Sequence, residues 1–217
     1  LTATNTVSIN GGYDISTATF VQDYPVGSQD LIPTSITFNN DGTKMYVLGA
    51  VGDDVNEYNL STAFDVSSAS YFQRFYVGSQ ESTPMGMTFN NDGTKMFITG
   101  WFRDYVNEYS LSTAFDVSSA TFAGNAERFY VGGQENKPEA IQFNNDGTKM
   151  YVIGLSGDEV NEYSLSTAFD VSTAVYTQVF SVNSQEIYPM GMTFNNDGTK
   201  MYVIGYSGDD VNEYSLS

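Results

Sequence analysis

The sequence predicts an all-β protein, a four-bladed β-propeller whose blades each contain four antiparallel strands. The motif FNNDGTKM occurs four times, beginning at Phe38, Phe89, Phe143 and Phe194, with spacings of 51, 54 and 51 residues. No stretch shows a convincing 3.6-residue apolar period, so almost no helix is expected. A tandem unit of about 50 residues made of short strands is typical of a propeller blade.

Each repeat is predicted to contain four strands, which we name A to D in chain order. In the second repeat, strand A covers residues 84–89, and the Asn-Asn-Asp-Gly that follows it forms a tight turn. Strand B covers residues 95–99, which are β-branched and aromatic, and strand C covers residues 105–111. Strand D ends near residues 129–131. The longer spacing of 54 comes from residues 123–125, which predict a bulge or widened turn in strand D.

The two ends of the chain predict how the ring closes. The sequence stops after a strand C at residues 211–216 and opens with an isolated strand D at residues 13–24. We expect this N-terminal strand to complete the fourth blade, because closure removes exposed sheet edges. The alternatives are a fragment of a larger propeller and an open solenoid. Because the chain begins at Leu1 rather than Met, we expect a processed form or a segment of a longer chain. The expected organisation is one domain over residues 1–217, with blades at about 25–77, 78–131, 132–182 and 183–217 plus the strand 13–24.

Composition excludes several classes of function. Eight Lys and Arg against 26 Asp and Glu give a formal net charge of −18, which disfavours nucleic acid and anionic lipid as partners. No apolar run approaches the roughly 18–20 residues of a membrane span, so no membrane insertion is expected. The absence of Cys and His excludes the usual zinc sites, Cys nucleophiles and Ser-His-Asp triads. The acidity is interpreted as a solubility feature, with attraction of cations as the alternative.

The repeat resembles a known kind of propeller. Asp-Gly-Thr-Lys-Met-Tyr-Val followed by Asp-x-Val-x-Glu-Tyr is similar to the bacterial YVTN-type extracellular repeats, and related segments occur in surface proteins of bacteria and in phage proteins. The resemblance covers residues 13–217 and lacks the Gly-His and Trp-Asp marks of WD40 repeats. It implies a surface, adhesion or scaffold module located outside the cell or on the surface of a cell or virion.

Residues that recur in every repeat are interpreted as scaffold. The Asp of each Asp-Gly-Thr-Lys motif is expected to cap its turn, with the following Gly at positive φ; the alternative is a ring of four cation sites. The Lys of strand B is expected to pair with the Glu of strand C across the sheet. The small residues early in strand A are expected to relieve crowding at the axis. These residues are Ser35, Gly86, Ala140 and Gly191.

Function is expected where the repeats differ, in the B–C loops. In a propeller these loops share one face with the D–A loops, and the single Trp of the chain lies in the second B–C loop. Aromatic rings beside amides and acids suit sugars, because a ring covers the C–H face while polar groups bind hydroxyls. Packing of the aromatic residues on a neighbouring loop, or a contact with another protein, is the alternative. The candidate ligand-binding residues are Trp101, Phe102, Arg103, Tyr206, Gln80, Glu81, Gln185 and Glu186.

The leading expectation is a non-enzymatic extracellular recognition or adhesion module that binds glycan. One alternative is a structural scaffold module of a phage or cell-surface assembly, and another is a hydrolase or lyase that uses carboxylates and Tyr on the loop face. Such an enzyme would lack His, the usual base at neutral pH. Partners are expected to be a glycan or a surface protein, with self-association or contacts in a parent assembly as further options. No catalytic residue, metal or cofactor is expected; the alternative is a cation, Ca²⁺ in particular, at Asp53, Asp54, Asp209 and Asp210.

Overall fold

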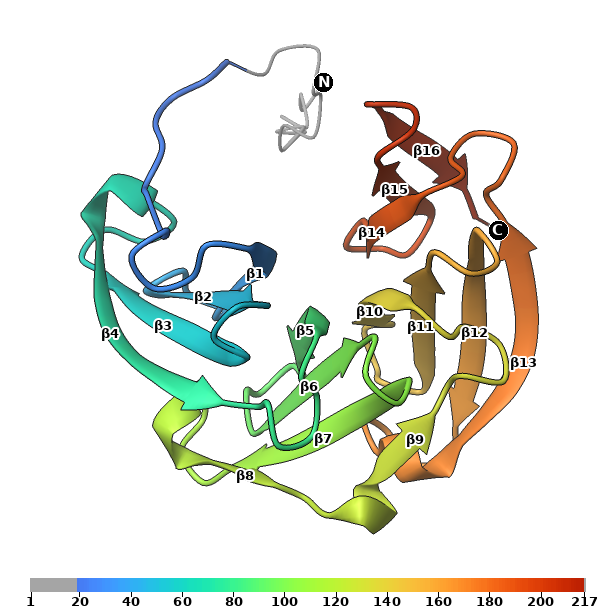
Figure 1. Ribbon diagram of the computed structural model, residues 1–217, viewed down its shortest axis with the longest axis horizontal. Helices are drawn as coiled ribbons and strands as arrows, with labels where there is room; N and C mark the ends of the chain where they lie inside the picture. The colour runs from blue at the N-terminus through green and yellow to red at the C-terminus, as the bar shows by residue number, and fades with distance from the viewer. Residues whose placement is uncertain (1–18, 217) are drawn as a thin grey trace, which may run out of the picture.

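The computed structural model describes residues 19–216 and consists of four antiparallel β-sheets arranged as blades around a central axis (Figure 1). The predicted all-β, four-bladed propeller is confirmed. In each blade strand A lies nearest the axis, and the sheet continues outward in chain order, through strands B, C and D in the first three blades and through B and C in the described part of the fourth. The first blade contains β1–β4, the second β5–β9, the third β10–β13 and the fourth β14–β16.

The strand bounds repeat from blade to blade. The A strands are β1 (Pro33–Phe38), β5 (Pro84–Phe89), β10 (Pro138–Phe143) and β14 (Pro189–Phe194). The B strands are β2 (Lys44–Gly49), β6 (Lys95–Gly100), β11 (Lys149–Gly154) and β15 (Lys200–Gly205). The C strands are β3 (Asp54–Leu60), β7 (Tyr105–Leu111), β12 (Glu159–Leu165) and β16 (Val211–Ser215). The D strands are β4 (Ala69–Tyr76), β8 (Ala120–Phe122) with β9 (Arg128–Tyr130), and β13 (Ala174–Ser181).

Helical structure in the described part of the chain is limited to single 3₁₀ turns, as the missing helical period predicted. None of these turns between residues 19 and 216 has the length or the apolar character that a bilayer crossing would need. Three of them follow an Asp cap and end the C–D connections of the first three blades, directly before strand D, and the fourth interrupts strand D of the second blade. The turns are η2 (Val66–Ser68), η3 (Val117–Ser119), η4 (Asn125–Glu127) and η5 (Val171–Thr173).

The three extra residues of the second blade break its strand D in two. β8 and β9 both pair with β7, and η4 separates them. Gly124 precedes η4 with φ +119°, a conformation that side chains rarely adopt. The predicted bulge or widened turn is therefore a helical turn that divides the strand into two halves, both of which pair with β7.

The Asp-Gly of each A–B connection forms a turn, as predicted. Gly42, Gly93, Gly147 and Gly198 have φ values of 70°, 72°, 71° and 71°. In the second blade the Oδ1 atom of Asp92 accepts hydrogen bonds from the Thr94 amide at 2.9 Å and from its hydroxyl at 2.6 Å. These bonds lower the pKa of Asp92, since they favour the ionised carboxylate. The repeated Asp thus caps the turn.

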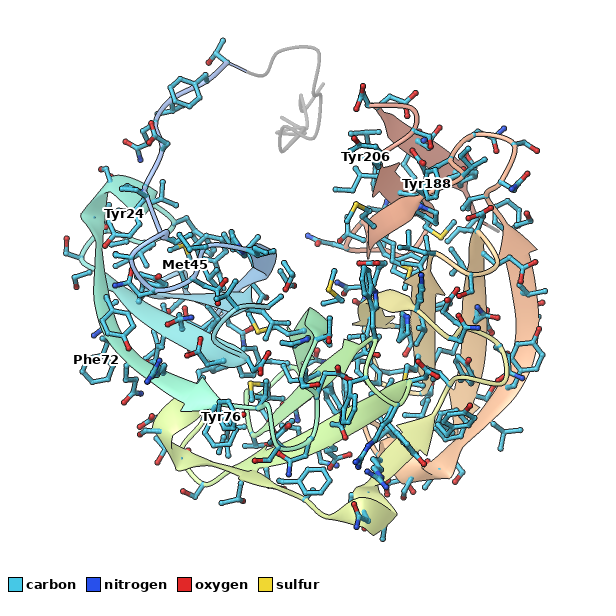
Figure 2. The ribbon with its side chains drawn as sticks, viewed as in Figure 1. Tyr24, Met45, Phe72, Tyr76, Tyr188 and Tyr206 are labelled. Carbon is cyan, nitrogen blue, oxygen red and sulfur yellow. The ribbon has the colours of Figure 1, made fainter. Side chains whose placement is uncertain are left out.

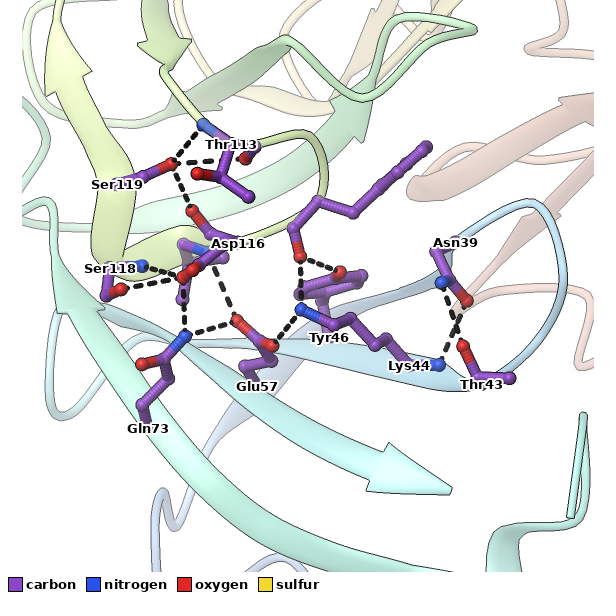
Figure 3. Close-up of polar contacts among 12 residues, drawn as sticks. Asn39, Thr43, Lys44, Tyr46, Glu57, Gln73, Thr113, Asp116, Ser118 and Ser119 are labelled. Carbon is purple, nitrogen blue, oxygen red and sulfur yellow. Dashed lines mark hydrogen bonds and ion pairs between the residues drawn. The ribbon is translucent and has the colours of Figure 1, made fainter. Parts of the chain in front are cut away.

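Neighbouring blades are held together by an apolar core and by a partly buried ion pair (Figure 3). Between the first two blades, the Glu57 carboxylate lies 2.6 Å from the Lys44 ammonium, which confirms the predicted B–C pairing. Glu57 also accepts a hydrogen bond from the Val117 amide of the next blade at 3.1 Å. The Lys44 ammonium donates to the Phe115 carbonyl of that blade at 2.8 Å. One ion pair therefore holds two blades together as well as two strands.

The predicted crowding of the A strands at the axis is clearest at Gly86 in the second blade. A Cβ on Gly86 would lie 2.7 Å from the Glu139 carbonyl oxygen and 2.8 Å from the Ala140 Cα of the next blade. Such distances are too short for any side chain at this position. Gly86 thus allows β5 and β10 to approach each other beside the central cavity.

The proposed closing strand lies partly outside the described residues, which begin at residue 19. Residues 19–24 form no strand, and β16 pairs with β15 alone within the described chain. The side-chain amide of Gln22 donates to Asp65, and the ring of Tyr24 meets the ring of Tyr58 at 5.7 Å. These contacts hold residues 22–24 against the first blade, and no described pairing joins residues 19–24 to β16, the predicted partner. In Figure 1 the first and fourth blades stand apart at this point of the ring.

Candidate active site

A buried carboxylate joins the D–A and B–C loops at one face of the propeller. Glu81 accepts hydrogen bonds from the backbone amides of Thr83 at 2.9 Å and Phe102 at 2.8 Å. Thr83 lies just before β5 and Phe102 lies in the following B–C loop, so one side chain fixes both loops. The equivalent residues make the same pair of connections. These are Asp30, Glu135 and Glu186.

The structure therefore places Glu81 and Glu186, both predicted to bind ligand, inside the loops with no exposed surface (0 %). Their environments differ. Burial raises the pKa of Glu81 to about 7, despite the two amide hydrogen bonds, and Asp104 and Asp53 contribute repulsion. Burial also opposes ionisation of Glu186, but its hydrogen bonds from loop groups outweigh that effect and its pKa is lowered. Both side chains support the loops that carry the remaining candidates.

Trp101 connects the second blade to the third. Its indole Nε1–H donates a hydrogen bond to Oε1 of Glu139 at 2.9 Å. The backbone amide of Trp101 donates to the Thr83 carbonyl at 3.1 Å, which anchors the residue in the B–C loop. The side chain retains 39 % of its surface exposed. Trp101 thus remains partly exposed while its polar edge is held by a carboxyl group of the neighbouring blade.

Glu139 is the functional candidate that the sequence analysis missed. It is the second residue of β10, is 2 % exposed and lines the central cavity. Burial raises its pKa to about 7, although the Trp101 hydrogen bond acts in the opposite direction. Nearby Glu135 raises the pKa further, and Lys137 lowers it. A carboxyl group in this state exchanges a proton near neutral pH, which is the property required of a general acid or base.

The sequence did contain a signal for Glu139. The equivalent positions in the other A strands are Thr34, Met85 and Met190, so only the third blade carries a charge there. Trp101 departs from the repeat in a B–C loop, and Glu139 departs from it in an A strand. The structure shows that these two non-repeated residues contact each other.

A third non-repeated residue completes this cluster. Lys137 stands two residues before Glu139, and its ammonium nitrogen lies 5.5 Å from the centre of the Trp101 ring. Ile32, Thr83 and Tyr188 occupy the equivalent positions in the other blades. A cation, a carboxyl group of raised pKa and a half-exposed indole therefore gather where the second and third blades meet.

The other predicted residues of the second blade lie beside this cluster. Phe102 is 37 % exposed, and the guanidinium carbon of Arg103 lies 4.6 Å from the centre of its ring. Arg103 has φ 70°, so the loop tip is held in a left-handed conformation. Oε1 of Gln80 accepts the Tyr109 hydroxyl at 3.5 Å, a weak contact that points toward the blade interior. Phe102 and Arg103 are the accessible members of this group.

The predicted residues of the fourth blade lie apart from the cluster. Tyr206 is 75 % exposed and carries its ring at the loop tip, as Figure 2 shows. Its backbone amide donates to the Tyr188 carbonyl at 3.0 Å, while Gln185 has an exposed side chain. No interaction recorded within residues 19–216 joins Tyr206 to Trp101. The two aromatic residues that differ from the repeat thus belong to separate parts of the loop face.

The aspartates considered for a cation have other partners or face solvent. Asp54 is buried (1 % exposed), pairs with the Arg74 guanidinium at 3.1 Å, and accepts from Asn56 at 2.7 Å. Burial raises the pKa of Asp54 and of Asp53. Asp209 and Asp210 are exposed on the fourth blade. Within the described part of the chain, no group of three or more acidic side chains is placed to hold a metal ion.

The central cavity has a volume of about 920 Å³ and is lined by the A strands of all four blades, together with Tyr202, Ile204 and Val211 of the fourth blade. It extends from Glu139, near the loop face, to Asn195 and Asn196 beside the turn at the opposite end. Most of its lining is apolar or small, as at Ile36, Gly86 and Met190. A cavity of this size accommodates a small organic ligand, and Glu139 is its ionisable group at the loop end.

Fold and site together define a β-propeller with a carboxyl-based candidate site at its axis. No protein-family model matches the sequence, and no curated protein matches it. Solved structures share the fold, and the chain spans about half the length of those described next. A protein from Lactobacillus plantarum has a TM-score of 0.59 at 17 % identity, over 85 % of this chain and 51 % of its own. A candidate 6-phosphogluconolactonase from Bacteroides fragilis has a TM-score of 0.59 at 15 % identity, over 91 % and 55 %. The periplasmic gluconolactonase of Pseudomonas aeruginosa has a TM-score of 0.57 at 14 % identity, over 85 % and 50 %.

These matches correct the functional prediction. The sequence led us to expect a non-enzymatic recognition or adhesion module, but propellers described as lactonases share this fold. The expectation that the protein is not an enzyme is therefore withdrawn. At 13–17 % identity the likeness establishes the β-propeller fold alone. No family match supports the finer resemblance to YVTN-type or phage repeats.

Proposed function

We propose that the protein hydrolyses a small cyclic ester, a sugar-derived lactone, bound at the loop end of the central cavity. The observation that carries the proposal is Glu139, a carboxyl group that is 2 % exposed, has a pKa of about 7 and lines a cavity of about 920 Å³. The lactonase descriptions of proteins with the same fold support the choice of substrate class. The repeats that resemble bacterial surface propellers support a site of action at or outside the cell surface.

The proposed reaction uses Glu139 as a general base. One carboxyl oxygen is held by the Trp101 indole, so the group is oriented, and the other oxygen takes a proton from a water molecule. The resulting hydroxide attacks the carbonyl carbon of the lactone and forms a tetrahedral intermediate. As the ring C–O bond breaks, the protonated Glu139 returns its proton to the departing alkoxide oxygen. The products are a hydroxy acid and the regenerated carboxylate.

Lys137 and Trp101 have supporting roles in this proposal. The Lys137 ammonium provides positive charge near the carboxyl group, where it stabilises the oxyanion of the intermediate or a phosphate on the substrate. The Trp101 side chain, 39 % exposed, offers an apolar surface to the C–H face of a sugar ring. Neither role requires His, which the chain lacks.

The test is hydrolysis of five- and six-membered aldonolactones, with and without a 6-phosphate, followed by acid release in weakly buffered solution. Glu139→Gln removes the base and is expected to lower kcat/KM by about 10²–10⁴-fold. Glu127→Gln, in η4 on the outer side of the second blade, is the matched control and should leave the rate unchanged. Because Glu139 acts as the carboxylate, kcat/KM should rise with pH and level off above about pH 7.

Two results would contradict the proposal. One is a wild-type rate no higher than that of buffer for every lactone tested. The other is a Glu139→Gln variant as active as the Glu127→Gln control. Trp101→Phe adds a second check, because it keeps an aromatic ring but removes the indole donor. It should shift the pH profile to higher pH, since that hydrogen bond lowers the pKa of Glu139.

A further inference from the structure

The first and fourth blades each present a sheet face whose residues are equivalent to those that meet at the junctions between neighbouring blades. Neighbouring blades within the chain meet at three junctions. We call the sheet face that packs on the following blade the outer face of a blade, and the sheet face that packs on the preceding blade its inner face. At the first junction Tyr46, Leu48 and Val55 of the first blade pack on Met87, Met96 and Val117 of the second. The fourth blade carries another such outer face and the first blade another such inner face. Within the described residues, no other blade covers either of these two faces.

The outer face of the fourth blade consists of Tyr202, Ile204 and Val211, which are equivalent to Tyr46, Leu48 and Val55. Ile204 and Val211 are each 49 % exposed, whereas Leu48 and Val55 are 0 % exposed. The same contrast holds for the ion pair. The Glu side chain of the pair is 0 %, 4 %, 14 % and 49 % exposed from the first blade to the fourth. The Glu side chain is therefore most exposed in the fourth blade, which no other blade follows.

The inner face of the first blade is open in the matching way. Ile36 is 59 % exposed, while its equivalents Met87, Ile141 and Met192 are 3 %, 1 % and 7 % exposed. A groove of about 420 Å³ runs along this face. Its lining residues Ile36, Met45, Val47 and Val66 are the counterparts of second-blade residues in the core of the first junction. Tyr24 and Val26 are the counterparts of Phe75 in β4 and of Val77, which directly follows β4, and both belong to the same core.

The first-blade face already holds the strand D contacts that a preceding blade would provide. Gln73 donates to Asp116 of the next blade, and Gln22 repeats this bond to Asp65. Tyr24 repeats on Tyr58 the edge-to-face contact that Phe75 makes with Tyr109; the ring separations are 5.7 and 5.6 Å. The residues that are missing are therefore an outer Tyr-Ile-Val face, which the fourth blade of this chain carries. Figure 2 places Tyr24 and Met45 on the first blade and Tyr188 and Tyr206 on the fourth, either side of the open part of the ring.

Polar groups complement each other across the same junction. Lys44 and Lys95 each donate to a Phe carbonyl of the next blade at 2.8 Å. The equivalent donor of the fourth blade is Lys200, whose recorded partner is Glu213 at 2.7 Å. The equivalent acceptor is the carbonyl of Phe64, whose ring is 60 % exposed. A fourth junction would therefore satisfy the same hydrogen bonds as the first two.

We propose that the fourth-blade face binds the first-blade face of a second copy of this chain, head to tail. The interface is heterologous, since different surfaces of the two copies meet. Two copies that engage both junctions form a closed two-chain ring, and copies that engage one junction each form a longer array. The inference depends on blade packing and does not require lactonase activity, although Ile36, Tyr202, Ile204 and Val211 of the proposed interface also line the central cavity.

The test compares single-face variants by light scattering during size-exclusion chromatography. The 217-residue chain is expected to have a mass of two or more chains. Ile36→Asp and Ile204→Asp each place a charge in one half of the junction, so each variant alone should have the mass of one chain. Val175→Asp is the control, because Val175 is 65 % exposed on the outer strand β13 and lies on neither face. It should keep the wild-type mass.

Mixing the two variants gives the decisive result. An Ile36→Asp chain retains an intact fourth-blade face, and an Ile204→Asp chain retains an intact first-blade face. Their equimolar mixture should therefore recover a mass of two chains through one native junction, which also shows that both variants are folded. A wild-type mass of one chain over a wide concentration range, or a mixture that stays at one chain, overturns the proposal and indicates closure within a single chain.

Discussion

The glycine that ends each A–B turn offers a sharp test of how the blades are built. Gly93 and Gly198 have the same backbone conformation, with φ +72° and +71°. They differ in their surroundings. A Cβ on Gly93 would lie 2.2 Å from Cδ2 of Phe115, whereas a Cβ on Gly198 would have no heavy atom of the described chain within 4 Å. Comparing substitutions at Gly93 and Gly198 therefore distinguishes the cost of backbone strain from the cost of displacing the aromatic ring that covers the turn.

The expected losses follow from these distances. Alanine at positive φ costs about 1 kcal/mol of unfolding free energy at either site. At Gly93 the methyl group must also displace the Phe115 ring, which packs on Phe89 with ring centres 5.4 Å apart. Losing that aromatic contact costs about 1 kcal/mol, and losing part of the ring's burial costs about 1 kcal/mol more. Gly93→Ala should therefore destabilise by about 3 kcal/mol and Gly198→Ala by about 1 kcal/mol.

Urea unfolding followed by tyrosine and tryptophan fluorescence measures both losses. A double-mutant cycle with Phe115→Ala isolates the ring, because Gly93→Ala in that background should cost only the strain of about 1 kcal/mol. Equal losses for Gly93→Ala and Gly198→Ala in the wild-type background would refute the reasoning. So would a loss at Gly93 that is unchanged when Phe115 is already absent.

Three further outcomes are expected. The pKa of Glu81 is about 7 in the folded protein, above its ordinary value of 4.5, so the folded state binds this proton more tightly than the unfolded state does. The free energy of unfolding should therefore fall as pH rises from about 4.5 to 7. Glu81→Gln should flatten that part of a profile of urea midpoint against pH. Burial raises the pKa of Tyr46 and Tyr109 beyond the usual range, so ultraviolet titration of the native protein should leave tyrosines un-ionised that titrate normally in denaturant. Gly100→Ala should prevent folding or cost more than about 3 kcal/mol, because its Cβ would meet the Thr83 carbonyl at 2.2 Å, while Gly133→Ala, with open space around it, should change the urea midpoint little.

Much of the fold follows from local sequence signals. The positive φ of the turn glycines and the pairing of Lys44 with Glu57 were predicted from residue type and spacing, and both are present. These features depend on residues within one hairpin, where the backbone geometry of adjacent strands is the same in every copy. Repetition within the chain also made scaffold residues recognisable, since each blade must solve the same packing problem.

The same reasoning predicted only part of the candidate site. Trp101 was identified because it departs from the repeat, but its partner Glu139 is 38 residues away in another blade. The sequence could show that each is unusual, and only the packing of the second blade on the third shows that they meet. The pKa of Glu139 likewise depends on burial at the axis, which no local pattern encodes.

The sequence by itself determined the plan of the blade: its strands, its turns and the Lys–Glu pairing of strands B and C. Only the tertiary structure showed that Glu139 is buried beside the central cavity and that the end faces of the first and fourth blades are exposed. Ile36 and Ile204 belong to positions that are buried in the other blades, yet here they are 59 % and 49 % exposed. A repeat specifies the contact between one blade and the next, but each copy encodes the same contact. Whether the last blade meets the first depends on the rotation accumulated over all the junctions, which is a property of the packed molecule.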